Sequence, residues 1–257
     1  MKAAPLLFGL LALIAWEAVV RAADVPPYIV PGPLAIISAF VAAPLSLLAA
    51  LASTLVVTFV ALAVAAFLGA ILALAMSVSR LAQAAIQPWA VVLQVTPIVA
   101  IVPLVIIWVG YLVHSPQLST LITLVVSATI VAFFPVFANT AEGLASAPPE
   151  LGDLFRLYGG GRWQTLGLLR LPAALPYFLT GLRISGGLAL VGAVVAEFVA
   201  GSGGFASGLA YTIQEAGFRL QVPRMFAALV LLSLAGIAIN LGLGALARFV
   251  LRRRGMA

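Results

Sequence analysis

Long apolar segments separated by short polar ones dominate the pattern along the chain. No Asp, Glu, Lys or Arg occurs between Asp24 and Arg80, or between Arg80 and Glu142. A helix needs roughly 20 apolar residues to cross a bilayer, so each of these segments has room for more than one crossing. The pattern predicts an all-α membrane bundle of about six spans. They are Leu6–Arg21, Leu51–Ser77, Pro88–Gly110, Leu118–Thr140, Tyr177–Ala200 and Met225–Phe249.

The segment between the first two spans is rich in proline, with Pro26, Pro27, Pro31, Pro33 and Pro44. Proline lacks an amide donor and clashes with the preceding turn, so this segment cannot form one regular helix. We expect it to lie outside the hydrocarbon or along its surface.

The first apolar segment has the length of a cleavable signal peptide, but Glu17 lies within it. Glu17 and Arg21 are four residues apart, in the order that favours an ion pair on a helix. Such a pair would lower the cost of both charges near the bilayer edge, so we predict an uncleaved first span.

Composition excludes several classes of protein. Of the 257 residues, 64% are hydrophobic and 8% are charged, too few charges to cover a water-exposed globule. The net charge of +6 does not indicate nucleic-acid binding, because the arginines lie singly among apolar segments except at Arg252, Arg253 and Arg254. The absence of cysteine excludes disulfides and cysteine metal sites. Lys2 is the only lysine, so the chain cannot contain the Gly-Lys-Ser/Thr of a Walker A sequence.

The basic residues also predict the orientation of the spans. If the N-terminus is cytoplasmic, only Arg21, Arg219 and Arg224 fall outside, and Arg183 is expected to extend to the inner interface. The positive-inside rule then places both termini in the cytoplasm, with Lys2, Arg80, Arg156, Arg162, Arg170, Arg248 and Arg252 to Arg254. We expect one membrane domain over residues 1–257. Residues 1–50 would form the first span and an extracytoplasmic linker, and residues 51–250 a five-span core with a loop at 141–176.

Small residues recur every four positions in the second span, at Ala65, Gly69, Ala73 and Ser77. We interpret this stripe as a surface on which another helix packs closely. By contrast, Gly201–Ala206 matches G-x-G-x-x-A only literally, because it follows a membrane span rather than a strand, and we assign it no dinucleotide site.

Polar residues and proline interrupt the third predicted span, where Gln94 and Thr96 precede Pro97. Broken backbone at membrane depth is tolerated where it is buried in protein or faces water. These residues therefore either line a translocation path or form a packed kink. Glu197, late in the fifth span, either reaches the outer headgroups or lines an outer gate, since a carboxylate at that depth is costly unless paired or hydrated.

The longest polar interruption runs from Ala141 to Pro176, on the predicted cytoplasmic side. Its first half predicts a short surface helix, because helix-start residues precede an apolar stripe at i, i+3, i+4 and i+7. The start signals are Ser146, Pro148, Pro149 and Glu150, and the stripe is Leu151, Leu154, Phe155 and Tyr158, opposite Glu150, Asp153 and Arg156.

Gly159, Gly160 and Gly161 should end this helix, because three successive glycines break a helical pattern. A second short amphipathic segment is predicted from Arg162 to Arg170, before Pro172 and Pro176 lead into the fifth span. The residues alone leave two roles open for the whole segment. It either lies in the lipid headgroups, with Trp163 as an anchor, or docks on another protein.

The spacing in this loop is similar to that of a known family. Asp153-Leu154-Phe155, Gly159 six residues after Asp153, and Leu169-Arg170-Leu171-Pro172 resemble the EAA---G---------I-LP loop of ABC importer permeases. The family's Glu-Ala-Ala is replaced by Asp-Leu-Phe. The segments from Gln94 to Gly110 and from Leu171 to Phe198 resemble permeases that import nitrate, taurine, alkanesulfonates and thiamine-precursor pyrimidines. The similarity extends from about Pro31 to Gly236.

This resemblance implies a type I ABC importer permease fold, with coupling helices that dock on a cytoplasmic ABC ATPase. It assigns the coupling to Glu150, Asp153, Leu154, Phe155, Arg156, Tyr158, Gly159, Gly160, Gly161, Arg162 and Pro172. The implied translocation path, which includes Gln94, Thr96, Pro97 and Glu197, lies between two permease copies in a bacterial inner membrane.

The implied partners are ABC ATPase subunits, an extracytoplasmic solute-binding protein, a second permease copy and membrane lipid. The ATPase would bind ATP, and we expect no cofactor in this chain. The solute would be a small nutrient such as a sulfonate, nitrate or a pyrimidine.

Two other functions remain open from the residues. An ion-gradient-driven secondary transporter usually needs intramembrane acids, and only Glu17 and Glu197 are available. A membrane-embedded hydrolase needs a nucleophile and a base, but His114 is the only histidine and no G-x-S-x-G motif occurs. We therefore expect a chain with no catalytic residues.

Overall fold

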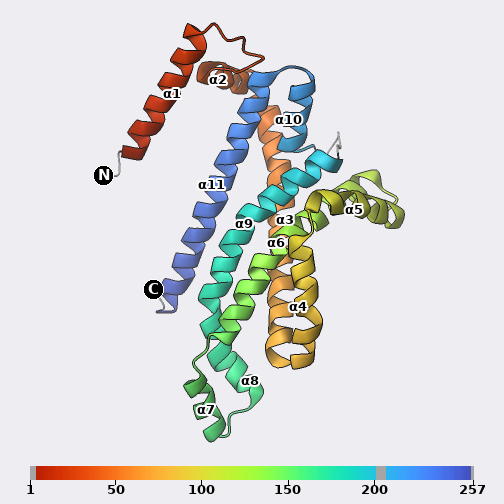
Figure 1. The fold of residues 1–257 in the computed structure, drawn as a ribbon, viewed down its shortest axis with the longest axis vertical. Coiled ribbons are helices and arrows are strands. Elements are labelled where there is room, and N and C mark those ends of the chain that lie inside the picture. The colour runs from red at the N-terminus through yellow and green to blue at the C-terminus, as the bar shows by residue number, and fades with distance from the viewer. Residues whose placement is uncertain (1–3, 201–206, 256–257) are drawn as a thin grey trace. The chain divides into compact units, whose positions relative to one another are not determined.

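A computed structural model describes residues 4–200 and 207–255, and all regular secondary structure in these residues is helical (Figure 1). Lys2 and Gly201–Ala206 lie outside the described residues. The all-α class predicted from the sequence is confirmed. The helices are α1 (Ala4–Ala22), α2 (Pro33–Ala42), α3 (Pro44–Val78), α4 (Arg80–Val95), α5 (Ile98–Leu112), α6 (Pro116–Ala145), α7 (Pro149–Leu157), α8 (Arg162–Thr165), η1 (Leu166–Arg170, a π-helical turn), α9 (Leu171–Ala200), α10 (Leu209–Phe218) and α11 (Val222–Arg253).

Four helices in the described residues are long and apolar enough to cross a membrane. They are α3, α6, the continuous helix Arg162–Ala200 and α11, and they correspond to the second, fourth, fifth and sixth predicted spans. The third predicted span is the pair α4 and α5, which is bent by 107° and adds a fifth span if it crosses as one. The 19-residue α1 overlaps the first predicted span, which stays a prediction.

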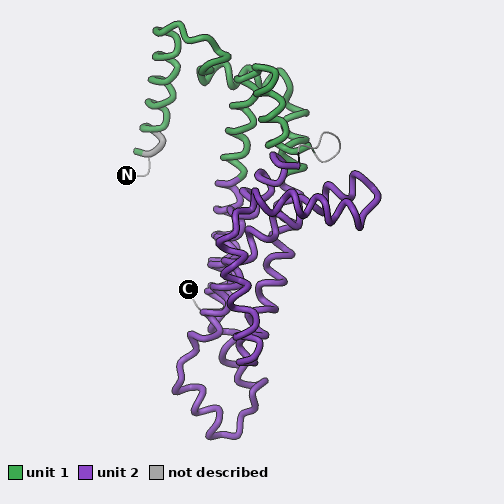
Figure 2. The backbone as a smooth tube through the Cα atoms, turned by 45° about the vertical axis from the view of Figure 1, so that its right-hand side comes forward, with its two compact units in different colours: residues 1–54, 201–235 green, residues 55–200, 236–257 purple. Residues whose placement is uncertain are grey.

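These helices form two compact units (Figure 2). Unit 1 contains residues 1–54 and 201–235, and unit 2 contains residues 55–200 and 236–257. α3 and α11 each contribute one part to both units.

Unit 1 has its own apolar core, in which α2, α10 and the adjacent parts of α3 and α11 bury Ile36, Leu47, Ala50, Leu209, Ile213, Ala227 and Ala228. The proline-rich segment before α3 is not one regular helix, as predicted, and Pro33 lies in the first turn of α2. The predicted ion pair forms, with Arg21 Nε donating to Glu17 Oε1 at 2.6 Å. Glu17 Oε2 also accepts the amide of Leu34 at 3.1 Å, so this carboxylate satisfies a donor at the start of α2.

Unit 2 is organised around the close packing of α6 on α9. A Cβ atom added at Gly181 would lie 2.7 Å from the carbonyl oxygen of Pro135, and one at Gly192 would lie 2.9 Å from Cα of Ala128. Between these glycines, the buried hydroxyl of Ser185 donates to the carbonyl of Ala132. Small residues on α9 therefore bring the two backbones together.

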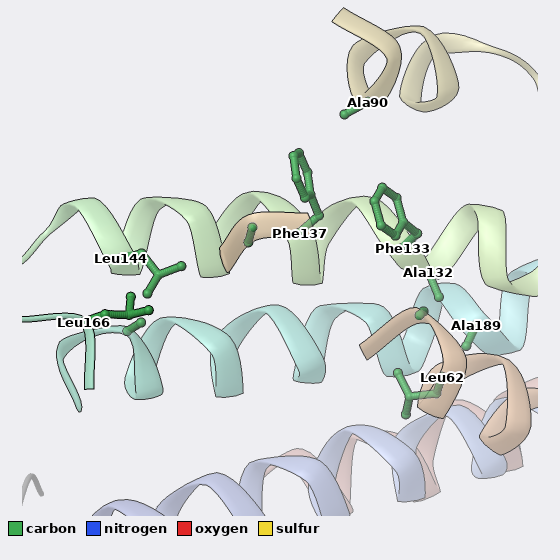
Figure 3. Packing of buried hydrophobic residues seen from close by; sticks show 11 residues of the cluster. Leu62, Ala90, Ala132, Phe133, Phe137, Leu144, Leu166 and Ala189 are labelled. Carbon is green, nitrogen blue, oxygen red and sulfur yellow. The ribbon is translucent and has the colours of Figure 1, made fainter. Parts of the chain in front are cut away.

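The small-residue stripe of the second span packs against α6, as predicted. Ala65 and Ala73 are fully buried, and a Cβ at Gly69 would lie 3.0 Å from the backbone nitrogen of Phe137. The rings of Phe133 and Phe137 stack with centroids 5.4 Å apart and project from α6 toward the helix that carries Ala90 (Figure 3). Helices α3, α4, α6 and α9 thus share one apolar cluster.

The predicted boundary at the start of the fifth span is wrong. Instead of a short segment followed by a separate span, one helix continues from Arg162 through Pro172 and Pro176 to Ala200. The π-helical turn explains this continuity, because the amide of Leu171 donates to the carbonyl of Leu166, five residues back. The wider turn accommodates the missing amide and the ring of Pro172 without ending the helix.

The α6–α9 contact can be tested with two equivalent substitutions in one helix. Gly181→Ala should lower the free energy of unfolding by about 1–3 kcal/mol, because its Cβ would overlap backbone atoms of α6. Gly187→Ala is the control, since no atom lies within 4 Å of its Cβ position. Thermal denaturation of the purified chain in detergent measures both. Equal stability of the two variants would contradict the close approach.

Candidate functional site

The helix α7 and the turn after it lie at one end of unit 2, between the C-terminus of α6 and α8 (Figure 1). Pro149 occupies the first turn, where its missing amide leaves no helical hydrogen bond unmade. Glu150 in the first turn and Arg156 in the last turn complement the helix dipole. The short helix predicted in this loop is therefore present.

One start signal was assigned to the wrong helix. Ser146 does not begin α7 but ends α6, where its amide donates to the carbonyl of Glu142 and its hydroxyl to that of Gly143. The residue that precedes α7 is Pro148. Serine can cap either end of a helix locally, so the sequence alone did not distinguish the two.

Each of the three glycines after α7 has a different structural task. Gly159 adopts a left-handed φ of +75°, and its amide donates to the carbonyl of Arg156 at 3.1 Å. The amide of Gly160 donates to the carbonyl of Phe155 at 2.7 Å, which completes a Schellman motif. Gly161 begins the next helix, and its amide donates to Gln164 Oε1 at 2.8 Å. The turn is therefore fully hydrogen-bonded at the backbone.

No side chain fits at Gly160. A Cβ there would lie 2.7 Å from the carbonyl oxygen of Phe155 and 3.1 Å from its ring. Gly161 is different, since its Cβ position lies 3.9 Å from the nearest atom, Gln164 Oε1. The direction in which the chain leaves α7 thus depends on Gly159 for its dihedral angle and on Gly160 for its space.

The segment exposes an unusual amount of apolar surface. Leu157 and Tyr158 are 85% and 84% exposed, and Trp163 at the start of α8 is 79% exposed. Leu151 and Leu154 of the predicted stripe are also exposed, whereas Phe155 is half-buried. Sequence reasoning did not single out Leu157. We call these five exposed side chains the apolar patch. A loop that only faces solvent does not need this much exposed apolar surface.

Two charged residues of α7 lie beside a concavity of about 610 Å³. Asp153, Arg156 and Arg162 line it, together with the ends of α3 and α6. Asp153 and Arg156 form an ion pair of 3.2 Å, but both are well exposed, so the pair contributes little stability. The concavity separates α7 from the body of unit 2.

Arg170 connects this segment to a third helix. Its Nη1 donates to the carbonyl of Ser77 at 3.0 Å, one residue before the end of α3. A cation at a helix C-terminus is favoured by the dipole and satisfies an otherwise unpaired carbonyl. Because the two residues are 93 positions apart, no local pattern indicated this contact. Pro172, assigned to the coupling role, follows directly after this anchor in the first turn of α9.

The residues assigned to the translocation path separate into two places. Thr96 ends α4 and Pro97 precedes α5, so the predicted backbone break lies between them, and the exposed Gln94 lies two residues before Thr96. Thr96 Oγ1 donates to the carbonyl of Val92 at 2.7 Å. Glu197 lies on α9 and is only 2% exposed, which disfavours the interpretation that it reaches the headgroups. Its gate role stays a prediction.

No group of three or more His, Cys, Asp or Glu side chains in residues 4–200 and 207–255 is placed to hold a metal ion. The features that the structure does show are a bundle of apolar helices, a broken span and an exposed apolar segment on a glycine turn. Together they define a polytopic helical membrane protein.

Comparison with known proteins identifies its class. Residues 65–255 match the family model described as "Binding-protein-dependent transport system inner membrane component", so the chain belongs to this family of ABC transporter permeases. It is a transmembrane permease subunit of an ABC importer for a small solute, and its place is the inner membrane.

Curated relatives agree with this assignment. The formylaminopyrimidine transport permease protein ThiX of Halalkalibacterium halodurans is 33% identical over 91% of this chain and 88% of its own length. The taurine transport system permease protein TauC of Escherichia coli is 30% identical over 77% of this chain and 68% of its own. The crystal structure of an amino acid ABC transporter has a TM-score of 0.65 at 19% identity, covering 85% of this chain and 98% of that one, and shows the same fold.

The anchor at Arg170 predicts the mobility of the segment that it holds. Arg170→Gln removes the charged donor to Ser77, so α7 and α8 should open more often. We expect chymotrypsin to cut at the exposed Leu157, Tyr158 or Trp163 about tenfold faster, equivalent to about 1.4 kcal/mol of opening free energy. The cleavage rate of Arg170→Lys, which keeps a cationic donor, should lie between the rates of the wild type and the glutamine variant. An unchanged cleavage rate in the glutamine variant would show that the hydrogen bond does not restrain the segment.

Proposed function

We propose that this permease receives mechanical work from a separate ABC ATPase through α7 and the apolar patch. The observation that carries this proposal is the exposure of Leu154, Leu157 and Tyr158 on a short helix with no partner helix over that side among the described residues. Docking on a protein would bury this surface and give it a function. The family assignment supplies the partner, because importers of this family work with an ATPase.

The position of α7 in the chain explains how a docked ATPase could move the membrane helices. The segment connects α6 to α9, the two most closely packed helices of unit 2, and Arg170 links it to α3. Movement of α7 would therefore be transmitted to three helices at once. Nucleotide-driven closure of two ATPases would in this way open the path on one side of the membrane, and their separation would open it on the other.

The assembly that we propose contains two copies of this permease, two copies of the ATPase and a solute-binding protein outside. Both termini and α7 face the cytoplasm, which the excess of basic residues on that side supports. ATP is bound and hydrolysed by the partner, since Lys2 is the only lysine and no Walker A sequence exists in this chain. The permease itself has no catalytic residues.

For the solute, we propose a small organic nutrient of the kind named for the curated relatives, such as a pyrimidine or a sulfonate. The polar residues at the break between α4 and α5 are candidates to line its path, because interrupted helices expose backbone polar groups at membrane depth. Gln94, Thr96 and Pro97 lie at this break, and the buried Glu197 belongs to α9.

The docking role predicts the effect of one charge placed in the apolar patch. Leu154→Asp should reduce the amount of ATPase that copurifies with the permease by about tenfold or more, as truncating a buried interface anchor commonly costs 2 kcal/mol. Gly152→Asp adds the same charge to α7 about 160° around the helix from Leu154, where no atom lies within 4 Å of its Cβ position. The control should retain the complex. If both variants retain it, α7 is not the docking element.

The proposed role of the glycine turn predicts that a substitution there uncouples ATP hydrolysis from transport. Gly160→Val should lower solute uptake per ATP hydrolysed by about tenfold, because a side chain there must displace α7 from Phe155 onward. Gly161→Ala, at the next position, has room for its Cβ and should transport normally. The measurement is uptake and ATPase activity in the same proteoliposomes. Normal coupling in the valine variant would contradict the role of the turn.

A further inference from the structure

Arg183 of α9 is held against the second half of α11 by a side-chain contact. Arg183 Nε and Nη2 both donate to Asn240 Oδ1, at 3.3 and 2.9 Å. Its guanidinium lies against Gly244, where an added Cβ would be 3.4 Å from Cζ. The sequence predicts that Arg183 extends to the inner interface, which stays a prediction, and the structure adds that the amide side chain of Asn240 on α11 holds it. Arg183 is nevertheless an exposed residue.

More arginines follow on the same side of α11. Residues four apart lie above one another on a helix, so Arg248 lies about 6 Å beyond Gly244 along the axis, and Arg252 one turn further. Arg248, Arg252 and Arg253 line a concavity of about 440 Å³ with Ala245 and Phe249. The guanidinium of Arg253 lies 4.5 Å from the centre of the Phe249 ring. Four cations, Arg183, Arg248, Arg252 and Arg253, therefore lie along the last part of α11, and we call this concavity together with Arg183 the groove.

No acidic side chain among the described residues forms an ion pair with these arginines. The three ion pairs found within residues 4–200 and 207–255 involve Arg21, Arg156 and Arg219, and none involves the four arginines of this groove. Asn240 is neutral, and Nη1 of Arg183 has no hydrogen-bond partner among the described residues. A cation near the hydrocarbon needs an anion or water. The groove is therefore able to accept an anion from outside the chain.

The surface beyond the arginines is apolar. Ile237 and Leu241 lie on the side of α11 that carries Arg248 and Arg252, and they are 56% and 61% exposed. An exposed apolar strip that ends in a cluster of arginines matches a molecule with hydrocarbon chains attached to an anionic head. A free solute anion would use the arginines but not the strip.

We propose that this groove binds the headgroup of one anionic phospholipid. Arg183, Arg248 and Arg252 donate to its phosphate, and its acyl chains lie along Ile237 and Leu241. Arginine suits this role because its planar group presents several donors to phosphate oxygens. The site requires only that α11 spans the membrane, so it is independent of the transported solute and of how α7 is coupled.

The test is to titrate the purified full-length chain with phosphatidylglycerol and to count bound lipid by native mass spectrometry. The wild type should retain one phosphatidylglycerol in preference to phosphatidylcholine. Arg248→Gln should raise the half-saturating lipid concentration about fivefold, equivalent to about 1 kcal/mol for one basic residue. Arg254→Gln also removes one positive charge, but Arg254 does not line the concavity. This variant should change the half-saturating lipid concentration by less than about twofold. Equal effects would show diffuse attraction to acidic lipid and would overturn the site.

Two further experiments identify the ligand and test whether Arg183 contributes to the groove. Inorganic phosphate added in excess should not displace the lipid, because it gains nothing from Ile237 and Leu241. Displacement would identify a free-anion site instead. Arg183→Lys keeps the charge but loses the planar group, so lipid affinity should fall while the fold persists. Unchanged affinity would remove Arg183 from the site, and solute uptake by the same variant reports separately on transport.

Discussion

The close approach of α6 and α9 is the contact on which the rest of unit 2 depends. Glycines on α9 allow its backbone to lie against that of α6, and the buried hydroxyl of Ser185 bridges the two by donating to a carbonyl. The two helices can shift together as a pair. They cannot separate without losing this packing, because no flexible side chains lie between them to fill the space. The segment from the end of α6 to the start of α8 therefore connects the two most closely packed helices of unit 2, since α8 continues into α9.

This geometry gives the glycine turn its importance. A loop between two independent helices could absorb a push at its tip by bending. Here the Schellman turn at Gly159 and Gly160 is closed by hydrogen bonds, and Arg170 fixes the returning helix to the end of α3. The anchor holds the returning helix, so we expect a displacement of α7 to pass into α3 and α9 instead of being absorbed by the loop.

How far the sequence predicts the structure depends on the distance over which each signal acts. Charge-free segments, the apolar stripe of α7 and the three glycines act locally, and each led to the correct element. The Glu17–Arg21 pair was equally local and is present, but its second partner, the amide of Leu34, is 17 residues from Glu17 and was not foreseen. The anchor of Arg170 on α3 and the contact of Arg183 with Asn240 depend on which helices are neighbours, and one sequence does not contain that information.

The prolines show why a local rule can fail inside a membrane protein. Pro97 ends a helix as the rule states, and the chain bends by 107° there, whereas Pro172 and Pro176 do not interrupt theirs. The difference lies in what surrounds each proline. Before Pro172 the backbone widens into a π-turn, and the adjacent Arg170 and buried Leu166 hold that turn against α3 and the apolar cluster. Tertiary contacts therefore determine whether a proline breaks a span, and in this chain they keep the helix continuous on the side where α7 is attached.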